Sequence, residues 1–338
     1  MEFDSLRGYL DAIETEMRSS IAVPAKALAP YYGMILYHMG WVDEDFSPAR
    51  QQAGKRLRPL LCLLTCEACG GDWHQAVPAA VAIELLHNFS LIHDDIEDNS
   101  PRRRHRPTVW SLWGRAQAIN AGDGLFAISR LALQQVAERG ASAEKVLHAF
   151  RIVDKTCLEL TEGQYLDLAY EEEEGVTVEM YLEMIAKKTG ALMGCATHIG
   201  ALLGTDDDLV IESYRSFGYQ LGLLFQIVDD ILGIWGTGEA TGKGVGEDIV
   251  QKKKSLPVIY ALQHSQELRD LYRSGGMDPV QQQKVMEIMR SLSALDYTRE
   301  MAARYLGLAL DALESARKEN QAQNHLRDIA GFLAERQH

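Results

Sequence analysis

Apolar residues recur at spacings of three and four along almost the whole chain, which is the pattern of helices that bury one face. Alternation of apolar and polar residues, the pattern of half-buried strands, is almost absent. Gly- and Asp-rich clusters separate the periodic stretches. The pattern predicts an all-α protein, a single domain over residues 1–338, with helices near residues 4–21, 24–39, 56–69, 74–98, 108–117, 120–138, 143–170, 177–187, 189–204, 207–233, 255–265, 279–293, 297–318 and 322–335.

Composition narrows the class of protein. The 338 residues are 46% hydrophobic, enough for a sizeable core, and 34 basic against 48 acidic residues give a net charge of −14. This acidic balance disfavours a nucleic-acid-binding protein, which needs an excess of Lys and Arg. No uninterrupted apolar run approaches the ~20 residues of a membrane span, and the acidic, amphipathic start is not typical of a targeting peptide. We therefore expect a cytoplasmic protein without stable membrane insertion and without nucleic acid as a partner.

The five cysteines are expected to be free thiols, because their number is odd and the protein is expected in the cytoplasm. Cys66 and Cys69 form a CxxC, with Cys62 one turn earlier. A zinc site would need a second such pair or a nearby His pair. Small side chains that face the core of a helix explain the spacing better.

Residues 81–110 hold a long apolar run that ends in a carboxylate cluster and is followed by a block of arginines. On a helix that turns about 100° per residue, Asp94 and Asp98 share a face, and His87 returns to within about 20° of it. Asp95 is displaced by about 100°, which suits an outer role. Two carboxylates one turn apart suit a hard cation such as Mg²⁺. The alternatives are a solvated acidic helix end and, for His87, a core histidine.

A second acidic pair, Asp229 and Asp230, also follows a long apolar run. Two such helix ends facing each other across a cavity would form a clamp for several metal ions. Basic motifs lie outside the apolar runs, at residues 54–58, 187–188, 242–243 and 252–254. Each alone is typical of surface charge. Together with the acidic clusters they favour two anionic groups bound side by side, one through metal and one through Lys and Arg.

Over roughly residues 50–260 the chain resembles the polyprenyl synthetase family of trans-isoprenyl diphosphate synthases. The resemblance rests on the motifs GKRLRP, LLHNFSLIHDDIED, RRHRPT, EGQYLDL, IAKKTG, FQIVDD and GKGVGEDIVQKKKSLP, which follow the family's order and spacing. It implies helices packed around a deep central cavity, a homodimer, and Mg²⁺, with three ions per active site. It also implies the head-to-tail condensation of isopentenyl diphosphate with an allylic diphosphate.

The resemblance further implies roles for individual residues. Those implied for the metal are Asp94, Asp98 and Asp229 as ligands, with Asp95 and Asp230 in support. Those implied for the allylic diphosphate are Arg103, Gln164, Lys188, Lys243 and Lys253. Those implied for isopentenyl diphosphate are Gly54, Lys55, Arg56, His87 and Arg104. Thr189 and Gln226 match positions beside the reacting carbons.

Three positions depart from the family's pattern. Gly233 replaces the last aspartate of the second acidic motif, so one outer carboxylate is missing, and we expect an active enzyme with weaker metal binding. His105 stands where a Gly is usual, and Ser255 where a Thr is usual. We expect these two changes to matter little.

Product length is set in this family by the residues four and five positions before the first acidic motif, here Ser90 and Phe89. A large side chain there stops the growing tail, so Phe89 favours a short product. Geranylgeranyl diphosphate is the first expectation and farnesyl diphosphate the next.

Three other functions stay open. A terpene-synthase-like enzyme would ionise and cyclise an allylic diphosphate, but it would not need the GKR motif, His87 and Arg104. A non-catalytic partner subunit is disfavoured by the intact first acidic motif and left open by Gly233. A helical protein that binds DNA or a membrane is disfavoured by the acidic balance.

Overall fold

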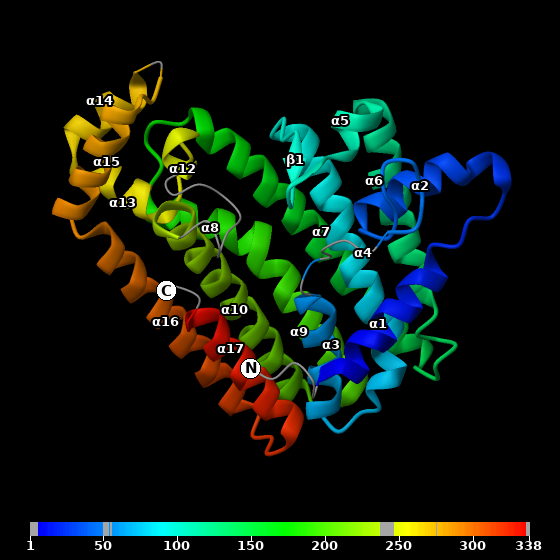
Figure 1. Cartoon of the computed structure of the whole chain (residues 1–338). Coiled ribbons are helices and arrows are strands. Elements are labelled where there is room, and N and C mark those ends of the chain that lie inside the picture. The colour runs from blue at the N-terminus through cyan, green and yellow to red at the C-terminus, as the bar shows by residue number, and fades with distance from the viewer. Residues whose placement is uncertain (1–5, 50–53, 55, 237–246, 275, 336–338) are drawn as a thin grey trace. The chain divides into compact units, whose positions relative to one another are not determined.

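The computed structural model describes residues 6–49, 54, 56–236, 247–274 and 276–335, and helices dominate it (Figure 1). The helices are α1 (Arg7–Ser20), η2 (Lys26–Leu28), α2 (Ala29–His38), α3 (Leu57–Ala68), α4 (Trp73–Glu97), α5 (Val109–Trp113), α6 (Arg115–Gln134), α7 (Ala143–Glu172), α8 (Val178–Ile185), η3 (Ala186–Gly190), α9 (Ala191–Gly204), α10 (Asp208–Trp235), α12 (Glu247–Val250), α13 (Leu256–His264), α14 (Gln266–Arg273), α15 (Pro279–Ser291), α16 (Ala294–Ser315) and α17 (Gln321–Glu335). The strands are β1 (Arg102–Arg103) and β2 (Arg106–Pro107), which pair antiparallel. The all-α prediction is confirmed.

Differences from the predicted elements have local causes. Gly114, at φ 83°, ends α5 at Trp113, whereas the predicted helix extended four residues further, to residue 117. The helix α14 was not predicted, because its sequence QELRDLYR is mostly polar and buries Leu268 alone. The β1–β2 hairpin is too short to show as an alternating pattern. Periodicity therefore located the long helices and missed elements of one or two turns.

By its internal contacts the chain divides into two compact units: unit 1 comprises residues 1–157, 195–215 and 316–326, and unit 2 comprises residues 158–194, 216–315 and 327–338. Each unit combines segments that are distant in the sequence. A single domain over the whole chain therefore stays a prediction.

In unit 1, α4 is the central helix and packs against α6, α3 and α1. Its buried residues lie on every side of the helix. Asp72 caps its first turn, because its side chain accepts a hydrogen bond from the backbone N–H of His74 at 3.0 Å. A helix that is apolar all round needs neighbours all round, which explains why α4 sits at the centre.

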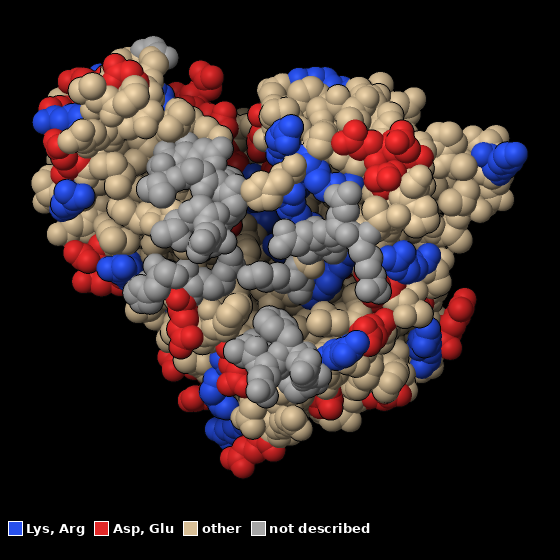
Figure 2. Space-filling view, viewed as in Figure 1, with Lys and Arg blue, Asp and Glu red and all other residues tan. Residues whose placement is uncertain are grey.

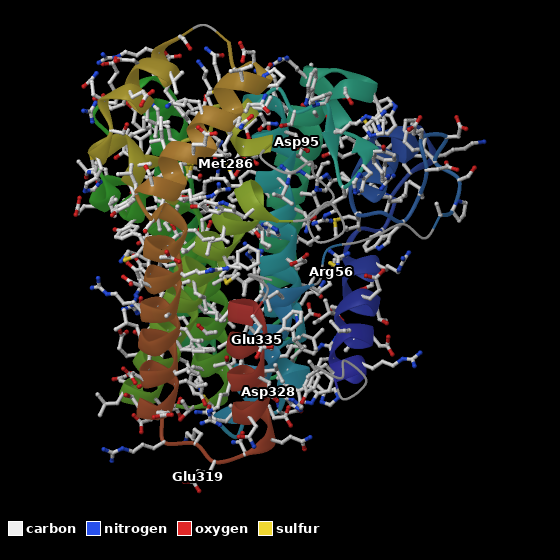
Figure 3. The ribbon with its side chains drawn as sticks, turned by 60° about the vertical axis from the view of Figure 1, so that its left-hand side comes forward. Arg56, Asp95, Met286, Glu319, Asp328 and Glu335 are labelled. Atoms are coloured by element: carbon white, nitrogen blue, oxygen red, sulfur yellow. The ribbon has the colours of Figure 1, made fainter. Side chains whose placement is uncertain are left out.

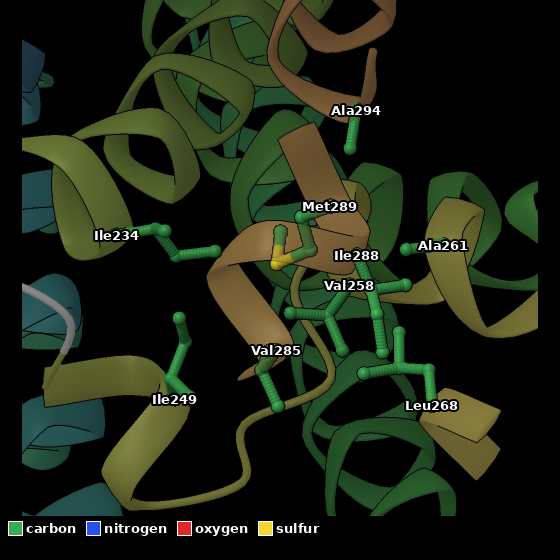
Figure 4. Packing of buried hydrophobic residues seen from close by; sticks show 9 residues of the cluster. All are labelled: Ile234, Ile249, Val258, Ala261, Leu268, Val285, Ile288, Met289 and Ala294. Carbon is green, nitrogen blue, oxygen red and sulfur yellow. The ribbon is translucent and has the colours of Figure 1, made fainter. Parts of the chain in front are cut away.

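In unit 2, residues from α10, α12, α13, α14, α15 and α16 share one buried cluster, shown in Figure 4. Ile234 and Ile249 join α10 and α12 to this cluster, with 0% and 1% of their surfaces exposed. The cluster thereby holds α12 against the end of α10 that follows the second acidic pair.

Two helices, α4 and α10, are long and apolar enough to cross a membrane by length and composition. Their apolar windows are 78% and 67% buried inside the protein, however, as in core helices.

Candidate functional site

The first carboxylate cluster lies at the C-terminal end of α4, where Asp98 is the C-cap residue. Arg103 of β1 donates from Nε to Asp95 Oδ1 at 2.7 Å and from Nη2 to Asp94 Oδ2 at 3.1 Å. Asp95 is 2% exposed, and burial raises the pKa of its carboxyl to about 6 although Arg103 opposes the shift. Asp95 thus anchors the hairpin, while the Asp94 side chain remains 18% exposed.

The hairpin turn places consecutive arginines next to different partners. Arg104 and His105 both have positive φ, 50° and 64°, as the two-residue turns that suit hairpins require. Glycine adopts a positive φ readily, which explains why a glycine is usual at position 105 in the family's motif. The sequence analysis expected the change from Gly to His105 to matter little. Arg104 approaches the backbone of Gly54, where a Cβ would lie 2.7 Å from its Nη2. Gly54 therefore makes room for the Arg104 guanidinium.

Arg56 is engaged by a buried carboxylate. Its Nη1 donates to Glu84 Oε1 at 2.8 Å, and the two side chains are 9% and 5% exposed. Asn88 also donates to Glu84 Oε1, at 3.2 Å. In Figure 3, Asp95 lies near one end of α4, and Arg56 lies lower in the view. This pairing gives Arg56 a structural role and disfavours the predicted role in binding isopentenyl diphosphate.

Arg58, which the sequence analysis did not select, lies beside His87 instead. Its Nη1 is 3.2 Å from His87 Nε2. Burial and then Arg58, Arg104 and Arg103 hold the pKa of His87 well below its usual range. At neutral pH His87 is therefore an uncharged imidazole within a basic cluster, rather than a cation. Arg56 and Arg58 both belong to the motif GKRLRP, so the sequence alone did not show which of them lies beside His87.

His38 of α2 is a second histidine that the sequence analysis missed. Burial, with Arg103 and Arg104, lowers its pKa to about 3, and a hydrogen bond with the Asn88 side chain partly opposes this shift. No motif in the sequence marks His38. Tertiary packing alone brings it to this cluster.

The basic residues form a visible group. In the view of Figure 2, Lys and Arg side chains gather where Figure 1 draws the β1–β2 hairpin and the neighbouring part of α4. Such a group gives this part of an otherwise acidic protein a local positive charge, which attracts anions. Lys55, predicted for the same pocket, lies outside the described residues.

The two predicted chain-length residues lie on α4. Phe89 is 9% exposed, and its ring packs against Phe126 of α6 at 5.4 Å and against His93 at 5.2 Å. Ser90 donates its hydroxyl to the carbonyl of His87 at 2.8 Å. Phe89 is thus part of an aromatic contact between α4 and α6, and its role in product length stays a prediction.

In unit 2 the second acidic pair divides into an exposed and a buried carboxylate. Asp229 is exposed, whereas Asp230 is 1% exposed. Asp230 accepts hydrogen bonds from the Tyr181 hydroxyl at 2.5 Å, the Leu256 backbone N–H at 3.0 Å and Gln226 Nε2 at 3.2 Å. Burial raises the pKa of Asp230 to about 6, although Lys253 opposes this. Asp230 is therefore a structural residue that holds the groups around it in place, next to the exposed Asp229.

A chain of hydrogen bonds continues from Asp230 to Thr189. Gln226 Oε1 accepts from the Thr189 hydroxyl at 3.1 Å, so Asp230 fixes the orientation of the Gln226 amide. Thr189 belongs to the π-helical turn η3, a form often found at functional sites. A Cβ on Gly222 would lie 2.6 Å from Gly190 Cα, so α10 and η3 approach through glycines. The close crossing brings Thr189 to Gln226.

The predicted diphosphate-binding lysines have different surroundings. Lys188, also in η3, forms an ion pair with Asp167 of α7 at 2.5 Å. Burial lowers the pKa of Lys253, but Asp248, Asp230 and Asp167 more than offset this and raise it. Lys243 lies outside the described residues. The Gln164 Nε2 is buried without a hydrogen-bond partner among the described residues, as expected of a group that meets a ligand.

The flanking lysines of the Lys252–Lys254 run are structural. Lys254 donates to the carbonyls of Tyr170 and Glu171 at 2.8 and 2.9 Å, at the C-terminal end of α7. Lys252 donates to the carbonyl of Tyr272 at 3.1 Å, at the end of α14. Cations at helix C-termini are favourable. The two outer lysines thus anchor the segment and leave Lys253 beside the carboxylates.

No three His, Cys, Asp or Glu side chains are grouped closely enough to hold a metal ion within the part of the chain that the structure describes. The four cysteines Cys62, Cys66, Cys69 and Cys195 are buried free thiols, and burial raises the pKa of Cys66 and of Cys69 to about 12. The carboxylates at residues 94, 98 and 229 are hard oxygen donors. They fit Mg²⁺, which takes few protein ligands and completes its shell with water and substrate phosphates.

Comparison with known proteins identifies the family. The family model described as polyprenyl synthetase matches residues 40–292. A geranylgeranyl diphosphate synthase of Mycobacterium tuberculosis is 43% identical over 249 residues, 72% of this chain and 70% of that protein. A (2E,6E)-farnesyl diphosphate synthase of the same species is 35% identical over 312 residues, 90% of this chain and 86% of that protein. The crystal structure of a polyprenyl synthetase from Streptomyces coelicolor superimposes with a TM-score of 0.88 at 35% identity, covering 96% of each chain. With its helical fold, its acid-tipped helices and its basic clusters, the chain is a member of the polyprenyl synthetase family.

Proposed function

We propose that the protein is a short-chain trans-isoprenyl diphosphate synthase, which condenses isopentenyl diphosphate head to tail with an allylic diphosphate. In this reaction the allylic C–O bond breaks and its electron pair leaves with pyrophosphate. The double bond of isopentenyl diphosphate forms the new C–C bond, and a proton leaves the adjacent carbon. The proposal is supported by relatives that are named as farnesyl and geranylgeranyl diphosphate synthases.

One observation within unit 1 carries the proposal. Asp94 and His87, the histidine of the basic cluster, both lie on α4, seven residues or about 10 Å apart, and Asp98 is the C-cap residue of the same helix. An acidic and a basic site at this separation suit two diphosphates, one bound through a cation and the other through guanidinium groups. A cyclase that ionises a single allylic diphosphate has no use for the second site.

We propose Asp94 and Asp98 of unit 1, and Asp229 of unit 2, as ligands of Mg²⁺, with three ions per active site. When bound, Mg²⁺ acts as a Lewis acid and a template at the departing pyrophosphate. Arg103 holds Asp94 and Asp95 in fixed positions beforehand, so the carboxylates need little reorganisation. Lys188, Lys243 and Lys253 add positive charge around the allylic diphosphate.

Neutral polar groups in unit 2 suit the reacting carbons. The Gln226 amide donates to Asp230 and accepts from the Thr189 hydroxyl, and neither of these two side chains carries a charge. Oriented dipoles of this kind stabilise developing positive charge without adding a nucleophilic anion. We assign them to the allylic carbon, as the family resemblance implied.

For isopentenyl diphosphate we propose Arg58, His87 and Arg104, together with Lys55, in place of Arg56. Arg58 contacts His87, whereas Arg56 is held by the buried Glu84. The uncharged His87 accepts or donates one hydrogen bond, and the guanidinium groups supply the charge.

Geranylgeranyl diphosphate is the proposed product, with farnesyl diphosphate second. The bulk of Phe89 and its contact with Phe126 support a short product, and the relative with 43% identity is named as a geranylgeranyl diphosphate synthase.

We also propose a homodimer in the cytoplasm. Large apolar side chains are exposed on α6 and α7, with Ile119, Leu131 and Leu147 exposed by 44%, 58% and 55%. Their exposure on these two helices supports a protein partner there. Light scattering of the purified protein measures the oligomeric state, and cell fractionation measures the location.

Product analysis tests the function. The purified protein would be incubated with Mg²⁺, isopentenyl diphosphate and, in turn, dimethylallyl, geranyl and farnesyl diphosphate. Linear, extended diphosphates that disappear with EDTA are the expected result. Hydrocarbon or alcohol formed without isopentenyl diphosphate would instead identify a cyclase. A folded protein that turns over no primer would identify a partner subunit.

A further inference from the structure

Arg106, the last arginine of the run after the first acidic cluster, has its guanidinium against protein groups on several sides. Its Nη1 donates to the Tyr37 carbonyl at 3.0 Å, and its Nη2 donates to the Val42 carbonyl at 3.1 Å. The guanidinium carbon also lies over the Tyr37 ring, 3.9 Å from the ring centroid. A planar cation held by two carbonyls and an aromatic ring is suited to joining two segments of the chain. Arg106 therefore has the surroundings of a structural residue rather than those of a phosphate ligand.

Tyr37 completes the contact from the side of α2. Its hydroxyl donates to the Pro107 carbonyl of β2 at 2.9 Å, so two residues join β2 to the C-terminal end of α2. Tyr37 is 2% exposed, and its ring packs edge-on against Trp113 of α5 at 5.0 Å. Because a well-packed aromatic ring has little freedom to move, Tyr37 provides a fixed attachment for β2.

The β1–β2 hairpin is thus attached to a different helix at each strand. Arg103 of β1 is bound to Asp94 and Asp95 of α4, whereas Arg106, its partner in the hairpin register, is bound to α2. Arg104 lies in the turn between the two strands, at a φ of 50°. The position of the Arg104 guanidinium therefore depends on both attachments.

The residue after Tyr37, His38, shows that α2 ends at the same basic cluster. Burial, Arg103 and Arg104 together lower the pKa of its imidazole, which places both guanidinium groups near it. Its ring is hydrogen-bonded to the Asn88 side chain of α4, and Asn88 Nδ2 in turn donates to Glu84 Oε1 at 3.2 Å. The C-terminal end of α2 is therefore one wall of this cluster.

We propose that Tyr37 and Arg106 form a clamp that positions the Arg104 guanidinium for the diphosphate of isopentenyl diphosphate. Arg106 is then a positioning residue, which acts through Arg104 and does not touch the substrate. The inference rests on the proposed function, which assigns Arg104 to that diphosphate. It adds α2 to the site, although α2 ends at His38 and the polyprenyl synthetase model matches residues 40–292.

Binding of isopentenyl diphosphate to the full-length protein, measured by calorimetry, tests the clamp. EDTA is present, so that binding through a metal ion does not contribute. Arg106→Met should raise the Kd about 10- to 100-fold, because the misplaced Arg104 loses a charge-assisted hydrogen bond. Tyr37→Phe keeps the ring and removes only the hydroxyl that reaches Pro107, so it should raise the Kd about two- to tenfold.

Arg139→Met is the matched control, because Arg139 also joins two segments of unit 1, through an ion pair with Glu16 at 2.8 Å. The Arg139 side chain is 44% exposed and belongs to neither strand of the hairpin. The variant should leave the Kd for isopentenyl diphosphate within about twofold of the wild type.

A double-mutant cycle separates positioning from direct contact and from a general defect of the fold. If Arg106 acts through Arg104, Arg106→Met should change the Kd by less than about twofold in an Arg104→Met background. Equal effects in both backgrounds would overturn the inference, because a phosphate ligand or an independent fold defect weakens binding in either one. An unchanged Kd in folded Arg106→Met or in Tyr37→Phe would overturn it as well. If Arg106→Met does not fold, Tyr37→Phe and its own cycle with Arg104→Met decide.

The wild type separates failure of this inference from failure of the proposed function. A wild type that binds isopentenyl diphosphate but extends no primer overturns the proposed function, and the variants still decide the clamp by their Kd values. A wild type that extends primers, with variants that bind like it, overturns the clamp alone. A wild type that binds no isopentenyl diphosphate overturns both.

Discussion

Replacing Arg56 or Arg58 by methionine should separate folding from substrate binding in unit 1. Arg56 and its partner Glu84 are 9% and 5% exposed and 2.8 Å apart. Removing one member of a buried pair leaves the other charge uncompensated, at a cost of about 3–5 kcal/mol. With about 2 °C of Tm per kcal/mol, the lower end of the range for large chains, Arg56→Met should lower the Tm by about 6–10 °C.

Arg58→Met should act on substrate binding instead. Losing one charge-assisted hydrogen bond to a diphosphate costs about 1.5–3 kcal/mol. Because 1.4 kcal/mol corresponds to a factor of ten, the KM for isopentenyl diphosphate should rise about 10- to 100-fold. The KM for the allylic substrate should change little, since the residues assigned to that substrate are different ones.

Thermal melts and steady-state kinetics at saturating allylic diphosphate measure the two effects. Arg7→Met is the control, because the Arg7 side chain is 79% exposed and its ion pair with Asp11 spans 3.9 Å at the surface. The reasoning is refuted if Arg56→Met melts like the wild type and raises the KM for isopentenyl diphosphate, or if Arg58→Met leaves that KM unchanged.

Three further predictions follow from single residues. His38 has a pKa of about 3 in the folded protein against about 6.5 unfolded, so the unfolded state binds more protons between these values and stability falls as the pH drops below 6.5. Between pH 6 and 5 the free energy of unfolding of the wild type, measured by urea unfolding, should therefore fall by up to about 1.4 kcal/mol per pH unit relative to that of His38→Gln. Equal pH dependence of the two proteins would contradict this. Phe89→Ala removes the ring that contacts Phe126 and should lengthen the product by at least one isoprene unit, as measured by mass spectrometry. An unchanged product would show that Phe89 is not the side chain that stops the growing tail. His105→Gly relieves a φ of 64° and should stabilise the protein by up to about 1 kcal/mol; a lower Tm would show that the His105 side chain contributes more than the turn costs.

Local sequence was sufficient for the helices and for the face that carries Asp94 and Asp98. A helix depends on residues within about four positions of each other, so apolar spacing and caps report it directly. The polar helix α14 and the π-helical turn η3 were missed, because neither buries a long apolar stripe of its own.

The sequence did not show which side chains pair with one another. GKRLRP offers two arginines, and only packing shows that Arg56 faces Glu84, 28 residues away, while Arg58 faces His87. The run of Lys252–Lys254 looks uniform, yet its outer members cap helices and its middle one faces carboxylates.

By itself the sequence determined an all-α chain with acid-tipped helices, a set of basic motifs and the family to which they belong. Tertiary structure alone decided which charged groups are buried and paired, and that Arg106, in a run of similar arginines, binds the C-terminal end of α2. The physical reason is that helix formation is settled between neighbours in the chain. The pairing of buried charges is settled by which helices the hydrophobic core brings together.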